Sequence, residues 1–175
     1  GERMNAFAAY LRIASSEDDG PGPLNPAGRG ALQEIDEHLS VRRDRWMQTR
    51  LAKLMAEATP EERQAMANSI QEHFDVAVGT NNDAQLRQFI SHFNGHSLAD
   101  KARVKLAEVY MEQDRLLEAE TLLARAQQSA DRSIAGAALA GLARLLTRAE
   151  HFDESAANYR RLARDWSDVP CHDGL

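Results

Sequence analysis

The chain has 175 residues, 43% of them hydrophobic and 27% charged, and a formal net charge of −6 at pH 7. This balance excludes a disordered chain, and its acidic sign argues against nucleic acid as a partner, because phosphate binding needs clustered Lys and Arg. Cys171 is the single cysteine, which excludes an intramolecular disulfide, and no apolar run reaches the roughly 18 residues of a membrane-spanning helix.

The first predicted element is an amphipathic helix over residues 1–15, with Phe7 and Leu11 on its apolar stripe. Its pattern is already under way at the first residue, which is not Met, so we expect the chain to be a piece of a longer protein. Residues 16–30 hold three of the five prolines and four glycines, a composition typical of a loop. The apolar residues that follow predict one long helix over residues 31–58.

A helix boundary is predicted immediately after this long helix. Thr59 suits an N-cap, Pro60 suits the first helical position, and Glu62 completes a capping box three residues after Thr59. The helix that begins here is expected to end near Gly79, which suits a left-handed C-cap.

The residues that could carry chemistry are few. His92 and His96 have the spacing of metal ligands on a helix, but Asn94-Gly95 lies between them and is expected to end the helix. Cys171, His172 and Asp173 are adjacent in the chain, so they cannot orient one another as a nucleophile and its base do. There is no Gly-rich phosphate loop and no serine elbow. We therefore predict no catalytic residue, no metal site, no cofactor and no enzymatic activity.

An internal repeat is the clearest signal in the chain. Two units, residues 98–133 and 134–170, each contain two helical segments, and no alternating segment of strand length is apparent, so we predict an all-α chain. Large and small residues recur 36 positions apart between the two units. The pairs are Leu106 and Leu142, Ala107 and Ala143, Tyr110 and Leu146, Leu116 and Phe152, Ala119 and Ser155, and Leu123 and Tyr159.

These positions resemble the tetratricopeptide repeat (TPR) family, whose pattern is W-x2-L-G-x2-Y, then A-x3-F, then P, over about 34 residues. Arg103 and Leu139 stand where the family has tryptophan, Ala107 and Ala143 replace glycine, and Pro170 closes the second unit. Within residues 31–97, the long helix is followed by a degenerate pair from residue 60. Residues 1–15 resemble the trailing helix of a truncated repeat, and residues 171–175 a tail or linker.

The resemblance implies a right-handed α-solenoid of antiparallel helix pairs, in which stacked pairs bury a continuous core and form a concave groove. It implies a non-catalytic module that binds a protein or peptide partner in this groove. By position in the repeat, Val104, Ala137 and Ala140 face the groove. The candidate binding residues beside them are Lys101, Glu108, Met111, Glu112, Arg144, Thr147 and Arg148.

Two features qualify this expectation. The lysine and asparagine that grip chaperone carboxylates in the family are replaced by Val104 and Glu108, so we do not expect a chaperone cofactor of that type. The phrase "RRLARDWSDVP" resembles the periplasmic branch of the family, which implies a bacterial envelope setting where such repeats can adjoin a β-propeller.

The groove charges leave two accounts open. Glu108 and Glu112 lie one turn apart on one predicted helix, and Arg144 and Arg148 lie one turn apart on another. Either the two rows pair with each other, or the arginines bind an acidic peptide. The alternative to a binding module is a structural segment in which helix 31–58 pairs with its own copy.

Overall fold

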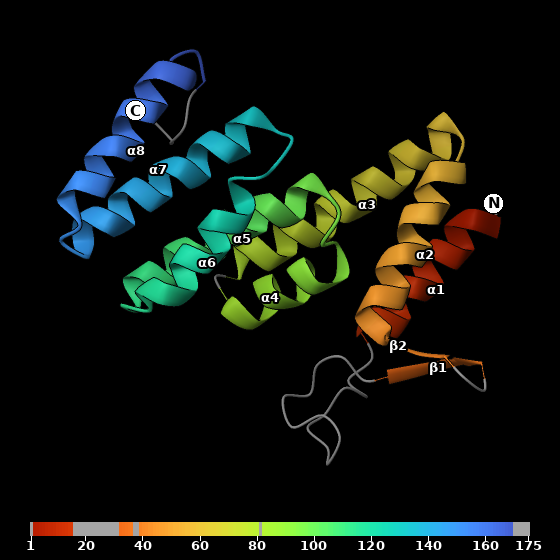
Figure 1. The fold of residues 1–175 in the computed structure, drawn as a ribbon. Coiled ribbons are helices and arrows are strands. Elements are labelled where there is room, and N and C mark those ends of the chain that lie inside the picture. The colour runs from red at the N-terminus through yellow and green to blue at the C-terminus, as the bar shows by residue number, and fades with distance from the viewer. Residues whose placement is uncertain (1, 16–31, 37–38, 81, 170–175) are drawn as a thin grey trace. The chain divides into compact units, whose positions relative to one another are not determined.

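The computed structural model describes residues 2–15, 32–36, 39–80 and 82–169 (Figure 1). Their elements are α1 (Glu2–Ser15), β1 (Leu32–Asp36), β2 (Leu39–Arg42), α2 (Arg43–Glu57), α3 (Pro60–Gly79), α4 (Asp83–His92), α5 (Ser97–Glu112), α6 (Leu116–Ala126), α7 (Arg132–Arg148) and α8 (Phe152–Asp165). This part of the chain is mainly helical, as the sequence predicts. It divides into two compact units, which are described separately: Gly1–His73 with Ser91–Gly95, and Phe74–Ile90 with His96–Leu175.

The single helix predicted over residues 31–58 is wrong. β1 and β2 form an antiparallel hairpin with an irregular register between Glu34 and Asp36, and only α2 is helical. Leu32, Ile35 and Leu39 have helix-compatible spacing, which produced the error, since short apolar segments fit either structure. The β-branched Ile35 and Val41 favour the extended backbone. Pairing of two copies through this segment would therefore involve α2, the helical part of the range.

In the first unit α1 packs against α2. Phe7 of α1 and Met47 of α2 are almost completely buried. Tyr10 meets Trp46 edge to face with ring centroids 5.7 Å apart, and the Arg50 guanidinium lies 5.4 Å from the centroid of the Trp46 ring. Trp46 therefore packs against Tyr10 and has a cation on its ring face.

The predicted capping box at the start of α3 is confirmed. The Glu62 backbone N–H donates to Thr59 Oγ1 at 3.2 Å, and the Thr59 N–H donates to Glu62 Oε2 at 3.1 Å. Each side chain therefore satisfies a backbone donor that the helix leaves without a partner. At the other end the expectation for Gly79 is wrong, because Gly79 is the last helical residue of α3 and does not have a positive φ.

In the second unit α5 packs against α6, α6 against α7, and α7 against α8, with α5 and α7 also in contact (Figure 1). Small residues allow these close approaches. Ala107 and Ala143 are completely buried, and an added Cβ at Gly141 of α7 would lie only 2.7 Å from Leu123 Cδ2 of α6. Substituting alanine or glycine for larger residues at such places lets helix backbones come together.

The two helix pairs end their first helices in the same way. The Arg115 N–H donates to the Tyr110 carbonyl, and 36 residues later the His151 N–H donates to the Leu146 carbonyl, both at 2.8 Å. This six-to-one hydrogen bond defines a Schellman turn at the end of α5 and again at the end of α7. The predicted equivalence of the two segments therefore extends to the backbone.

A buried arginine occupies the position where the resemblance places tryptophan in the first pair. Arg103 is 4% exposed and forms an ion pair with Asp100, one turn earlier on α5. Burial lowers the pKa of Arg103, and the charge of Asp100 opposes that effect. The alkyl part of an arginine fills space as an apolar side chain does, while here the Asp100 carboxylate neutralises the charge of the guanidinium.

Candidate functional site

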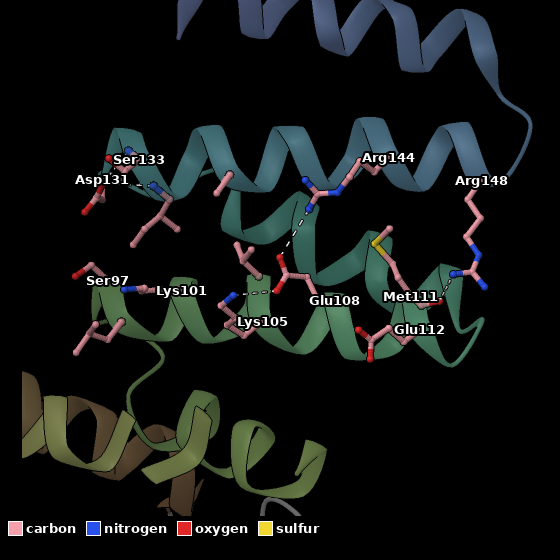
Figure 2. Close-up of a pocket in the computed structure, with 14 residues that line it drawn as sticks. Ser97, Lys101, Lys105, Glu108, Met111, Glu112, Asp131, Ser133, Arg144 and Arg148 are labelled. Carbon is pink, nitrogen blue, oxygen red and sulfur yellow. Dashed lines mark hydrogen bonds and ion pairs between the residues drawn. The ribbon is translucent and has the colours of Figure 1, made fainter. Parts of the chain in front are cut away.

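A groove of about 940 Å³ lies between α5 and α7 (Figure 2). Its α5 wall consists of Ser97, Leu98, Lys101, Val104, Lys105, Glu108, Met111 and Glu112. Its α7 wall consists of Ile134, Ala137, Arg144 and Arg148, with Asp131 and Ser133 at the start of the helix. α5 and α7, the first helices of the two repeats in the second unit, thus line one groove.

The walls of this groove are equivalent in their position within the repeat. Five pairs of lining residues lie 36 positions apart: Ser97 and Ser133, Leu98 and Ile134, Lys101 and Ala137, Glu108 and Arg144, and Glu112 and Arg148. Because the period places the same helical face of each unit on the groove, two chemically different walls are built on one backbone pattern.

Most residues expected in the groove lie there. All five expected positions of α5 line it, and so do Ala137, Arg144 and Arg148 of α7. Ala140, which is 8% exposed, is not among the lining residues. Thr147 is not either, because its hydroxyl donates to the Ala143 carbonyl at 3.0 Å and contacts Ser155 Oγ of α8 at 2.7 Å.

Several lining residues were missed. Ser97 and Leu98 lie 36 positions before Ser133 and Ile134, and each pair has similar side chains, so extending the repeat to these positions was an available signal. Lys105 lies one helical turn after Lys101, which is a second available signal. Asp131 is the N-cap of α7, where its carboxylate accepts from the Ser133 N–H at 2.8 Å.

The centre of the groove is bridged by Glu108. Its carboxylate lies 3.1 Å from Lys105 Nζ on the same helix and 3.7 Å from Arg144 Nη2 on α7 (Figure 2). All three side chains are about one-third exposed. The pairing of acidic and basic rows across the groove therefore holds for Glu108 and Arg144.

The second acidic and basic positions do not pair. Arg148 Nη1 donates to the Met111 carbonyl at 2.6 Å, and its Nη2 lies 3.0 Å from Asp114, so Arg148 is held at the C-terminus of α5. Arginine in this position also satisfies a terminal carbonyl of the helix. Glu112 is exposed, and in the described part of the chain its carboxylate has no hydrogen bond or ion pair.

At the other end of the groove Lys101 is exposed. Its ammonium lies 5.5 Å from the centroid of the Phe74 ring and has no carboxylate partner among the described residues. Between Lys101 and Glu112 the lining includes the apolar Val104, Met111 and Ala137 beside the ion-paired Lys105, Glu108 and Arg144. The groove therefore has an unneutralised cation near one end, an unneutralised anion near the other, and between them apolar side chains beside a cluster of charges that neutralise one another.

The other candidate groups form no site. His92 ends α4 and His96 is the N-cap of α5, where its Nδ1 accepts from the Leu98 N–H at 3.2 Å, so the two rings do not share one helix face. Among the described residues no group of three or more His, Cys, Asp or Glu side chains could hold a metal. Pro170, Cys171, His172 and Asp173 lie outside those residues.

Comparisons with known proteins identify no relative. No family model matches the sequence. No curated protein and no solved structure matches it either. Within the described ranges, none of the helices combines the length and the apolar character needed to cross a membrane.

Proposed function

We propose that this chain is a non-catalytic, TPR-like protein-interaction module of a larger bacterial protein, and that it binds an extended peptide in the groove between α5 and α7. The observation that carries the proposal is the equivalence of the groove walls, in which first helices 36 residues apart present the same face. Consecutive helix pairs with this property stack into a right-handed solenoid, whose concave side is a binding surface.

The charges of Lys101 and Glu112, which have no partner among the described residues, indicate the charge pattern of the peptide. Lys101 and Glu112 are 11 positions apart on α5, which corresponds to roughly 16 Å at about 1.5 Å per residue. An extended peptide covers that distance with about five residues. We infer a ligand with an acidic group near Lys101, a basic group near Glu112, and apolar side chains between them against Val104 and Met111. Charge at the ends would fix its direction, and burial of its middle would supply affinity.

Peptide display on the folded chain tests this proposal. Ala137 is partly exposed on the groove wall, so Ala137→Arg should fill the groove and abolish binding of the selected peptides. Ala124→Arg, the same change at an exposed position of α6 outside the groove, is the matched control and should leave binding intact.

The result that overturns the proposal is also specific. If display selects no peptide with this charge pattern, the inferred ligand is wrong. If the selected peptides bind the two variants equally well, the groove is not the binding surface. Circular dichroism of both variants confirms beforehand that the fold is retained.

A further inference from the structure

Phe152 and Tyr159 on the outer face of α8 are more exposed than the apolar residues 36 positions earlier in α6, Leu116 and Leu123. Phe152 is 63% exposed and Tyr159 is 46% exposed, whereas Leu123, which lies 36 residues before Tyr159, is 1% exposed. Leu123 is covered because α7 brings Gly141 against it. No later helix covers α8 among the described residues. An exposed apolar face on one side of a helix is typical of an interaction surface.

The face has the pattern of a helix-pairing seam. Phe152, Ala156, Tyr159 and Ala163 follow one another at intervals of four, three and four residues, which is the spacing of one seam of a two-helix coiled coil. The equivalent positions in the first pair are Glu120 of α6 and Gln127, the C-cap of α6, in place of the two alanines. The α8 seam is therefore more apolar than the equivalent positions of the first pair, where Glu120 is exposed, and it alternates large with small residues.

We propose that this seam binds α8 of a second copy of the chain in an antiparallel arrangement. With a two-fold axis near the middle of α8, Phe152 lies against Ala163 of the second copy, and Tyr159 lies against its Ala156. Each large side chain then meets a small one, and every contact is made twice. A dimer of this kind goes beyond the proposed groove function and leaves the groove open.

Charge selects the antiparallel direction. Asp153 and Arg160 are seven residues apart, so they lie on the same flank of the seam. Within the described residues neither side chain has a hydrogen bond or an ion pair. Antiparallel pairing brings Asp153 beside Arg160 of the second copy and the reverse, because equivalent flank positions of two helices face each other in that direction, whereas in a parallel pair in register they lie on opposite sides of the seam.

Sedimentation equilibrium of the 175-residue chain over a wide concentration range provides the first test, and a monomer–dimer equilibrium is expected. Ala163→Glu places a carboxylate on the seam and should abolish the dimer. Ala157→Glu is the matched control, because Ala157 is also exposed on α8 but lies away from the seam. A chain that stays monomeric up to the solubility limit overturns the proposal, and so does an equal effect of the two substitutions.

Charge reversal tests the direction. Asp153→Arg and Arg160→Asp should each weaken the dimer about tenfold, because the two-fold axis replaces two attractive contacts by two repulsive ones. The double variant exchanges the charges and should return the dimerisation constant to within about threefold of the unaltered chain. If the double variant is as weak as the single variants, the antiparallel pairing is wrong. Circular dichroism checks that each variant remains folded.

Discussion

Asp114 and Glu150 occupy the same backbone position 36 residues apart, with φ values of 61° and 63°, and they are the two non-glycine residues of positive φ in the described chain. Each is the residue after the C-cap of a first helix, α5 or α7, in a Schellman turn. Glycine is the usual residue there, because a Cβ is strained in the left-handed region. The repeat thus preserves a strained turn without the residue that relieves it.

Glu150→Gly should therefore stabilise the chain by about 0.5–1 kcal/mol, the relief of left-handed strain less the entropy of the added glycine. The free energy of urea unfolding, at unchanged slope, measures it. Asp114→Gly is expected to gain less, because it also removes the ion pair between Asp114 and Arg148. Destabilisation by Glu150→Gly would show that the Glu150 side chain has a role that outweighs the strain.

Thr59→Ala should lower the free energy of unfolding by about 1 kcal/mol, because the Glu62 N–H loses its acceptor at the start of α3. Thr49→Ala is the matched control. Thr49 is exposed in α2 and its hydroxyl donates only to the Arg45 carbonyl of its own helix, so this change should be close to neutral. Equal denaturation midpoints for the two variants would contradict the role of the cap.

Ala107→Leu and Ala143→Leu should each lower the free energy of unfolding by roughly 1–3 kcal/mol, because both alanines are completely buried between helices and a larger side chain must displace its neighbours. Ala124→Leu at an exposed position of α6 should have little effect. Thermal unfolding followed by circular dichroism compares the three. A neutral result at both buried positions would contradict the close packing of the pairs.

The period predicted much of this arrangement. It identified Ala107 and Ala143 as close contacts because a small residue recurring among large ones reports helix proximity, whatever the partner residues are. It failed for Thr147, because its equivalent Met111 has no hydroxyl. The hydrogen bond of Thr147 to Ser155 exists only in the second pair, where both positions carry hydroxyls. Such a contact depends on two positions at once, which a single repeat pattern does not contain.

The hairpin of β1 and β2 shows a different limit of prediction from the sequence. Leu32, Ile35 and Leu39 satisfy the helical spacing, and the strands β1 and β2 are each too short to show a clear alternation.

The charges of the groove show a third limit of prediction from the sequence. Sequence placed Glu112 and Arg148 on facing helices, but Arg148 instead binds the terminal carbonyl of Met111, a backbone group that no residue pattern identifies.

His96 should make stability depend on pH. Burial lowers the pKa of His96 below its ordinary value of 6.5, so in the unfolded chain His96 binds its proton at a higher pH than in the folded chain. The contribution of neutral His96 to the free energy of unfolding is therefore complete above pH 6.5. It is lost as the pH falls through the pKa that His96 has in the folded chain. Protonation also removes Nδ1 as acceptor for the Leu98 N–H.

His96→Asn keeps an N-cap acceptor without a titrating group, so its stability should fall less between pH 7 and pH 5 than that of the unaltered chain. His151→Asn, at an exposed histidine in the turn before α8, is the control and should leave the His96 contribution in place. Identical pH profiles for the unaltered chain and His96→Asn would show that the cap does not titrate in this range.

The groove arginines should act mainly on stability. Arg144 pairs with Glu108, and Arg148 binds both the Met111 carbonyl and Asp114, so both tie α7 to α5. Removing both with Arg144→Ala and Arg148→Ala should lower the free energy of unfolding by about 1–2 kcal/mol, since partly exposed charged contacts are each worth about 1 kcal/mol or less. Binding of groove-selected peptides should persist in the folded double variant.

Lys101→Ala is the contrasting change. Lys101 has no carboxylate partner among the described residues, so its loss should weaken peptide binding with little effect on unfolding. Titration calorimetry with one selected peptide, on variants first shown to be folded, separates the two roles. If the arginine double variant lost binding at unchanged stability, the arginines would be ligand contacts, and the second account of the groove charges would replace the first.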